Sequence, residues 1–162
     1  MSLVAHWKLE GDGTDDLGNY DGIVHGSPSW SNGILGTCYD NSSGGSNGVE
    51  LLQHADASKY DKEHSWSLWF KSTTTSGDSY ARILSRDCSE YLCIYLDQSV
   101  ASPQPMAYTN QNVTVDEWYH VVVTTNDNHT YDKYINGEFI ETDSHAYDGT
   151  ARPWVIGGNT EG

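Results

Sequence analysis

The sequence has few basic residues and no long apolar run. Lys and Arg number 8 against 23 Asp and Glu, so the net charge of the 162 residues is −15. This charge repels nucleic-acid phosphates and anionic lipid headgroups. No stretch approaches the ~20 apolar residues that a membrane-spanning helix needs, and no signal-peptide pattern follows Met1. We therefore expect no nucleic-acid partner and no insertion into a membrane.

Cysteine is also scarce, and its spacing argues against a zinc site. The three cysteines, Cys38, Cys88 and Cys93, lack paired Cys or His neighbours at the spacings of structural zinc. Cys88 and Cys93 flank an expected hairpin turn and could form a disulfide in an exported protein. Cys38 lies in an expected strand, where we interpret it as a small buried residue.

The abundant residues indicate an all-β protein. The chain has 11 Tyr, 6 Trp and 16 Gly but 2 Met, a composition typical of aromatic-rich strands joined by tight turns. Turn signals recur along the whole chain, and no amphipathic helix longer than two turns is visible. We predict a two-sheet antiparallel β-sandwich, or jelly roll, that fills residues 1–162 as one domain. Residues 1–3 and 161–162 look like ends introduced by cloning.

Several segments carry specific strand signals. Apolar and polar residues alternate over 65–71, which predicts a half-buried strand whose Trp66, Leu68 and Phe70 face the core. The valine run in 118–125 predicts a central strand buried on both faces. Asn136-Gly137, which tolerates positive φ at both turn positions, predicts a hairpin between 131–135 and 138–140. Further strands are expected over 4–9, 23–25, 37–40, 49–52, 80–85, 91–96, 106–108 and 154–156, with one helical turn over 55–63.

An acidic loop is expected after the first strand. Between Asp12 and Asp21 carboxylates and an amide alternate with glycines, and a Ca²⁺ ion takes six to eight such oxygen ligands. The loop is not an EF-hand, because Leu17 and Ile23 stand where that motif needs Gly and Glu. It could equally be a solvated turn. The candidate calcium ligands are Asp15, Asn19, Asp21, Asp12 and Asp16.

No catalytic arrangement is apparent in the sequence. Residues 44–48 match G-x-S-x-G, but a nucleophile elbow needs a strand before Ser46 and a helix after it. The chain also lacks a Glu-x-Asp-x-x-Glu run that would place the two carboxylates of a sandwich-fold glycoside hydrolase on one strand. The 7 histidines form no H-x-H or H-E-x-x-H pair, and we expect His120 to be half-buried on its strand. We predict that the protein is not an enzyme.

Six segments occur in an order that characterises a known family. They are Ala5–Leu9, Asp15–Gly22, Ser67–Lys71, Glu117–Thr124, Tyr134–Glu138 and Val155–Asn159. In this order the chain resembles the laminin G-like, concanavalin A-like jelly-roll domains of bacterial, phage and extracellular proteins. Such domains usually continue past the Ile-Gly-Gly piece into a further strand with an acidic pair. This chain stops at Gly162, so the strand was removed, comes from another molecule, or is missing and leaves an open sheet edge. Lys133 replaces a usually apolar residue, which predicts a less buried hairpin.

The resemblance implies a non-catalytic binding or adhesion module that works outside the cell, on a cell surface or on a virion. Carbohydrate is the ligand that it implies first, with Ca²⁺ as a possible stabilising cofactor. The alternatives are a structural or protein-interaction module, including self-association through the open edge, and a relative of glycoside hydrolases. Aromatic residues that could stack on a sugar ring, or else pack in the core or at the rim, are Trp30, Tyr108, Tyr147 and Trp154.

Overall fold

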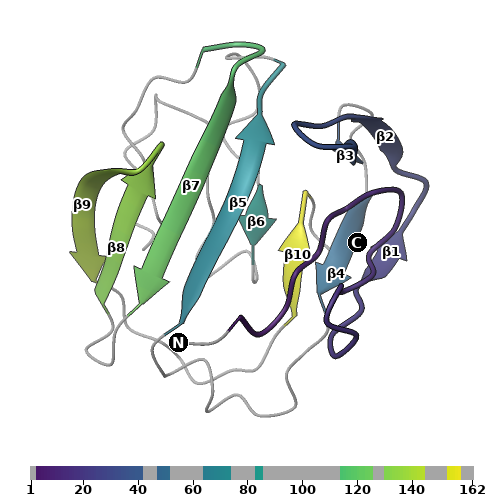
Figure 1. Ribbon diagram of the computed structural model, residues 1–162, viewed down its shortest axis with the longest axis horizontal. Coiled ribbons are helices and arrows are strands. Elements are labelled where there is room, and N and C mark those ends of the chain that lie inside the picture. The colour runs from purple at the N-terminus through teal and green to yellow at the C-terminus, as the bar shows by residue number, and fades with distance from the viewer. Residues whose placement is uncertain are drawn as a thin grey trace.

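A computed structural model of the chain shows an antiparallel, all-β architecture (Figure 1). The structure describes residues 3–41, 47–51, 64–73, 83–85, 114–125, 130–144 and 153–157. Within these ranges it has ten strands and no helix, and no segment there is a helix long and apolar enough to cross a membrane. The strands are β1 Ile23–His25, β2 Ser29–Asn32, β3 Thr37–Asp40, β4 Gly48–Leu51, β5 Ser65–Lys71, β6 Leu84–Ser85, β7 Trp118–Thr125, β8 Thr130–Ile135, β9 Glu138–Ser144 and β10 Trp154–Ile156.

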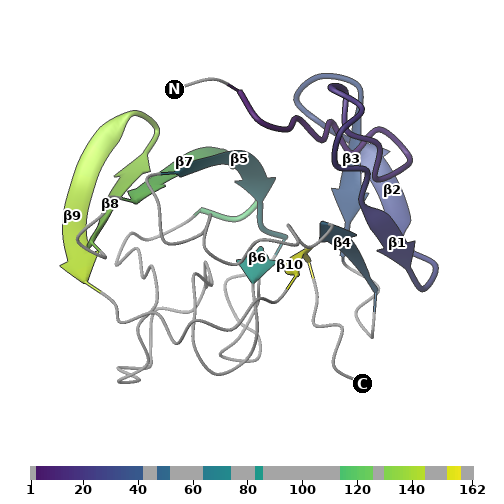
Figure 2. The same cartoon turned by 90° about the horizontal axis from the view of Figure 1, so that it is seen from below.

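The strands form two four-stranded sheets and one separate hairpin. One sheet has the order β1-β4-β10-β6, the other β5-β7-β8-β9, and β2 pairs with β3. Figure 2 shows that β5-β7-β8-β9 arches over one side of the molecule, with β6 and β10 in the layer beneath β5. The two sheets share one core, built from Val49, Leu51, Leu84 and Trp154 on one side and Phe70, Val121, Val123 and Ile135 on the other. The predicted two-sheet sandwich is therefore confirmed.

The pleat of β5 and β7 separates an inner from an outer face. In β5 the inner residue Phe70 is buried, whereas its outward neighbours are exposed, as the alternation predicts. In β7 Val121 and Val123 are buried, but His120 and Val122 keep part of their surface exposed. The prediction that β7 is buried on both faces is wrong. Successive side chains of a strand point to opposite faces, so the valine run sends only alternate members into the core.

The β8–β9 hairpin confirms the turn predicted from Asn136-Gly137. Both residues have positive φ, 51° for Asn136 and 84° for Gly137. The turn is also tied to β7. The backbone N–H of Asn136 donates to the carbonyl of His120 at 2.8 Å, and the N–H of His120 donates to Asn136 Oδ1 at 2.9 Å. The turn therefore holds the hairpin in a fixed position along β7.

Lys133 lies in the interior of the hairpin sheet. Its side chain is 1% exposed, and Nζ donates to Oε1 of its cross-strand partner Glu141 at 3.0 Å. A register shift between Lys133 and Tyr134 sets this pairing. The expectation that Lys133 makes the hairpin less buried is wrong, because the carboxylate of Glu141 compensates the buried ammonium.

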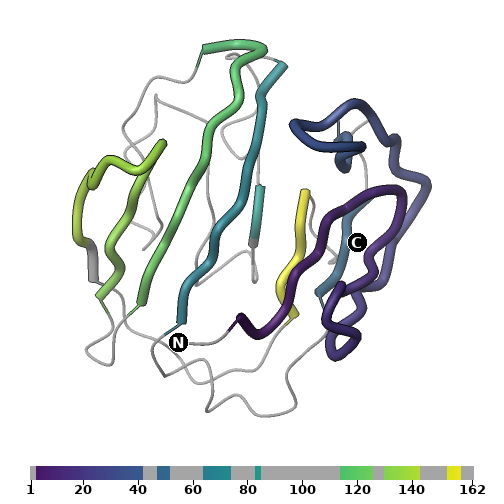
Figure 3. Tube along the Cα trace, in the orientation of Figure 1, coloured from purple at the N-terminus to yellow at the C-terminus, as the bar shows by residue number. Residues whose placement is uncertain are grey.

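The N-terminal segment, traced in Figure 3 from residue 3 to β1, differs from the prediction. Residues 4–9 form no strand. They contribute a single bridge between Trp7 and Asp15, and Leu9 adopts a positive φ of 59°. β2 was not predicted, although it pairs along its whole length with the predicted β3. Cys38 in β3 is a free thiol that is only partly buried, so it is more exposed than the buried residue that was expected.

Other predictions fall outside the described residues. These are the helical turn at 55–63, the strands at 91–96 and 106–108, and the pair Cys88 and Cys93. Of the strand predicted over 80–85, the described part contains β6.

Candidate functional site

The acidic loop is organised around the carboxylate of Asp15, which is 2% exposed. Its Oδ1 accepts the backbone N–H groups of His6 at 2.7 Å and Leu17 at 3.1 Å. Its Oδ2 accepts those of Asn19 and Tyr20, both at 3.1 Å. One side chain thus satisfies four backbone donors from both arms of the loop.

These contacts determine the charge of Asp15. Burial raises the pKa of its carboxyl group. The four N–H donors together lower the pKa by more than burial raises it, so the pKa lies below its ordinary value. A carboxylate offers about four lone-pair sites, and here four hydrogen bonds occupy them. In the structure Asp15 therefore holds the loop in its fold, and its prediction as a calcium ligand stays a prediction.

Two further calcium candidates also bond to the backbone of the loop. Asp21 Oδ1 accepts the N–H of Asp15 at 2.9 Å, and Asp12 Oδ1 accepts the N–H of Thr14 at 2.9 Å. The second bond is an Asx turn, the usual use of an aspartate in a polar loop. Each of these two carboxylates keeps its second oxygen outside these bonds.

The last two candidates lie on the outside of the loop. Asp16 Oδ2 lies 2.8 Å from Lys8 Nζ and 3.3 Å from His6 Nδ1, in an exposed cluster of charges. Asn19 contributes its backbone N–H to Asp15. In the described ranges no group of three or more His, Cys, Asp or Glu is arranged to hold a metal. A calcium ion held by oxygens of Asp12, Asp15, Asp16, Asn19 and Asp21 stays a prediction.

A series of aromatic contacts connects the acidic loop to the core. The indole N–H of Trp7 donates to the carbonyl of Tyr20 at 2.6 Å, and the Trp7 ring stacks on Trp66 at 6.2 Å. Trp66 in turn packs against Trp154 at 4.7 Å. Trp154 is 3% exposed, so it is a core residue with no face open to a sugar ring. This corrects its prediction as a ligand-binding residue.

Trp30 remains a candidate at the rim. It lies partly exposed on β2 and meets Tyr39 edge to face, with ring centroids 5.8 Å apart. The other two candidates, Tyr108 and Tyr147, lie outside the described residues.

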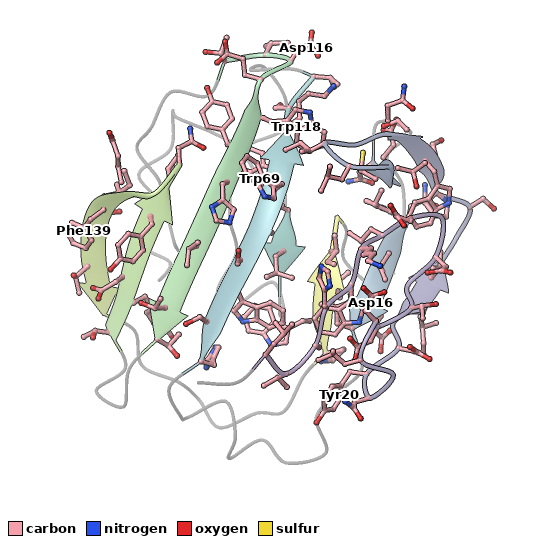
Figure 4. All side chains as sticks on the ribbon, viewed as in Figure 1. Asp16, Tyr20, Trp69, Asp116, Trp118 and Phe139 are labelled. Atoms are coloured by element: carbon pink, nitrogen blue, oxygen red, sulfur yellow. The ribbon has the colours of Figure 1, made fainter. Side chains whose placement is uncertain are left out.

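Among the described residues, exposed and partly exposed rings gather on the outer face of the β5-β7-β8-β9 sheet. Figure 4 shows Trp69, Trp118 and Phe139 on this face, which is turned toward the viewer. Strand register places His120 opposite Trp69 and Tyr134 opposite Phe139. We call this set the aromatic row, which consists of Trp69, Trp118, His120, Tyr134 and Phe139.

The rings on β5 and β7 are held in place by specific contacts. The Trp69 indole stacks on the His120 imidazole with centroids 4.8 Å apart and planes 29° apart. His120 Nε2 lies 2.8 Å from the hydroxyl of Ser67, with which it forms a hydrogen bond. At the next pair that faces outward, Lys71 Nζ lies 5.5 Å from the centre of the Trp118 ring, in a cation–π contact. Trp69 nevertheless remains 55% exposed.

The other end of the row lies on the hairpin. Tyr134 and Phe139 meet edge to face at 5.7 Å, and Phe139 is 56% exposed. Val122 of β7 pairs with Tyr134 and so lies between the two halves of the row. Exposed rings gathered on one face of a sheet in this way suit a binding surface.

No residue of this row is among the aromatics that were predicted from the sequence to bind a ligand. One signal was present. Trp69 occupies a polar-face position in an alternating strand, between the inward Leu68 and Phe70. A tryptophan on the solvent face of a strand leaves part of its ring open to contact, which makes it a candidate for binding a ligand.

Two antiparallel sheets packed around a shared core define the chain as a β-sandwich protein. Residues 43–162 match the laminin G-type family described as the concanavalin A-like lectin/glucanases superfamily, and the chain belongs to this family. No curated protein matches the chain.

Two solved structures are similar to the chain. Domain 4 of AbnA, a GH43 extracellular arabinanase from Geobacillus stearothermophilus solved in complex with arabinotriose, is 18% identical with a TM-score of 0.67. That match covers 96% of this chain and 82% of the other. A structure described as a receptor binding domain is 17% identical with a TM-score of 0.60, covering 96% of this chain and 42% of the other. At these identities the likeness shows the fold.

Proposed function

We propose that this domain is a non-catalytic module that recognises carbohydrate outside the cell. The observation that carries the proposal is the Trp69 indole, which is 55% exposed and held flat against His120. An indole presents a broad apolar surface with low conformational entropy, which suits stacking against the C–H face of a sugar. The family is one of lectins and glucanases by its description, and the similar domain of AbnA was solved with arabinotriose.

The groups around Trp69 suit hydrogen bonding to sugar hydroxyls. Ser67 offers a hydroxyl, His120 an imidazole nitrogen and Lys71 an ammonium group, all next to the ring. Glycoside hydrolysis in contrast needs two carboxylates about 5–9.5 Å apart across the scissile bond. On the described strands of this face, strand register places one carboxylate, Asp132, and not a pair, so we propose that the surface binds and does not cleave.

A glycan array followed by calorimetric titration tests the proposal. The purified domain is expected to bind a restricted set of glycans with affinities in the micromolar to millimolar range, about −8 to −4 kcal/mol. Incubation with a bound polysaccharide should release no reducing sugar. An array without signal, together with no heat of binding up to millimolar oligosaccharide, would refute the proposal.

A protein receptor is the second candidate ligand, and one observation favours it. The turn between β2 and β3 carries Ile34 and Leu35 at its tip, and Leu35 is the most exposed of the large apolar residues described. An apolar tip on a hairpin suits insertion into a protein surface better than contact with a sugar. A glycan array without signal, together with self-association of the domain in sedimentation velocity, would support a protein ligand. The acidic loop could add a calcium dependence to either function.

A further inference from the structure

We propose that the glycan-binding site is the outer face of the β5-β7-β8-β9 sheet, and that its ligand is an extended, uncharged polysaccharide lying across the strands. This inference rests on the proposed carbohydrate-binding function and assigns the site and the class of ligand. Its basis is the juxtaposition of the aromatic row with hydrogen-bonding groups on one rigid surface.

The surface is organised before any ligand arrives. Trp69 stacks on His120, and His120 is fixed by its bond to Ser67 at 2.8 Å. The backbone of His120 is in addition tied to the turn residue Asn136 by two hydrogen bonds. Since these groups already occupy defined positions, little conformational entropy remains to be lost on binding.

The extent of the row indicates the length of the ligand. Its two most exposed rings, Trp69 and Phe139, lie on the two edge strands of the sheet, β5 and β9. Three inter-strand spacings of ~4.8 Å separate these strands, so the rings are at least ~14 Å apart. A single sugar, which is about as wide as one aromatic ring, cannot contact both. The ligand that uses the whole row is therefore a chain of several sugar units that crosses the strands.

The composition of the face favours a glycan over a second protein. The exposed rings alternate with small hydroxyl side chains, Ser65 and Ser67 on β5 and Thr124 on β7. The same face carries one carboxylate, Asp132, which accepts the hydroxyl of Thr142. A stable protein interface uses roughly 20–30 residues a side around a continuous apolar centre. The aromatic row is narrower than that and is interrupted by polar groups, a pattern that matches the alternating apolar faces and hydroxyl edges of a sugar chain.

The charge of the protein selects among glycans. A net charge of −15 repels polysaccharides that carry uronate or sulfate groups. On this face Lys71 already contacts the Trp118 ring. A single lysine is not a cluster of cations and does not attract a polyanion. We therefore assign an uncharged polysaccharide.

Binding measurements on single-site variants test the inference. Trp69→Ala is expected to weaken binding of a neutral oligosaccharide about tenfold or more, the loss of one aromatic stacking contact. Trp69→Tyr keeps a ring and should recover most of the affinity. Phe139→Ala should weaken long oligosaccharides several-fold and leave disaccharides almost unaffected. Trp30→Ala, which removes a partly exposed Trp from the separate β2–β3 hairpin, tests the rim candidate. Circular dichroism and thermal melts verify that each variant is folded.

The outcomes separate the site from the function. If no glycan binds to the intact domain, the proposed function fails and the inference fails with it. If a glycan binds with equal affinity to the Trp69 and Phe139 variants, or loses affinity only with Trp30→Ala, the site lies elsewhere while the function stands. Preference for an acidic over a neutral polysaccharide overturns the assigned ligand class. Sedimentation that shows a dimer abolished by Trp69→Ala would make a second copy of the chain the occupant instead.

Discussion

The Asp15→Asn substitution tests the central contact of the acidic loop. Asparagine has the same shape as aspartate but carries one acceptor oxygen and one NH₂ group. The oxygen can keep two of the four backbone N–H donors that Asp15 now satisfies. The other two N–H donors would face the NH₂ group, which is itself a donor and cannot accept a hydrogen bond from them. The substitution therefore removes charge and acceptors without creating a cavity.

The cost follows from these two lost bonds. A buried donor left without a partner costs about 1–3 kcal/mol, which gives a range of about 2–6 kcal/mol for two. Leu17 and Asn19 lie in exposed parts of the loop, where water can replace some of the loss. We therefore expect destabilisation of about 3 kcal/mol, near the low end. For a chain of this length that corresponds to a decrease in Tm of roughly 6–12 °C.

The effect should depend on pH in a defined direction. The pKa of Asp15 is lower in the folded than in the unfolded protein, so its carboxylate contributes stability above the unfolded value of about 3.9. This contribution is lost as the pH falls through the folded pKa, where Asp15 takes up a proton. The stability difference between the wild type and Asp15→Asn should accordingly be full at neutral pH and shrink below about pH 4.

Denaturant and thermal unfolding of both proteins at pH 7 and at decreasing pH provide the measurement. Asp12→Asn is the matched control, because Asp12 accepts one N–H with one oxygen and asparagine retains that oxygen. The control is expected to change stability by less than about 0.5 kcal/mol, as for most surface substitutions. The role assigned to this carboxylate would be refuted if Asp15→Asn is as stable as the wild type. It would also be refuted if the loss of stability stays the same at low pH.

Three further predictions concern other parts of the fold. Lys133→Met should change the free energy of unfolding by less than ~1.5 kcal/mol in urea denaturation, because the partner left behind, Glu141, is 39% exposed and water can hydrate its carboxylate. Lys133→Glu should cost more than ~3 kcal/mol, because it sets two carboxylates against each other. Asn136→Ala should cost about 1–3 kcal/mol in the same assay, because it strains a residue with φ of 51° and removes the acceptor of the His120 N–H; Asn136→Asp should retain most of the stability. Calcium at millimolar concentration should raise the Tm and EDTA should reverse the rise if the 12–21 loop holds the ion, and an unchanged Tm in both conditions would exclude it.

The sequence was sufficient to predict those elements whose signals are local. The alternation over 65–71 gave the bounds of β5, and Asn136-Gly137 gave the hairpin, since a type I′ turn depends on those two residues alone. The order of short strands also indicated the correct fold class. In each case the deciding information lies within a few residues of chain.

The errors arose where a contact joins two segments, because the pattern along a single segment does not show its partner. Residues 4–9 have strand composition, but their partner is in part the Asp15 side chain, which takes the N–H of His6 in place of a neighbouring strand. Lys133 is buried because Glu141 reaches it across a shifted register, which no periodicity reveals.

The candidate site was the hardest part to predict for the same reason. The aromatic row collects residues from positions 69 to 139, and only strand register shows that they share one face. A single sequence indicates which residues of one strand point the same way, but not which strands are neighbours.

The pairing of β5 with β7 has a consequence for how the protein folds. β7, β8 and β9 follow one another in the chain, whereas β5 ends at Lys71 and its partner begins at Trp118. Contacts between near neighbours form faster than those that close a long loop, so we expect the β7–β8–β9 meander to form first and β5 to dock onto it later. Trp69 then reaches His120 only in the docking step, and its fluorescence should report the arrival of β5 as a phase separate from formation of the hairpin.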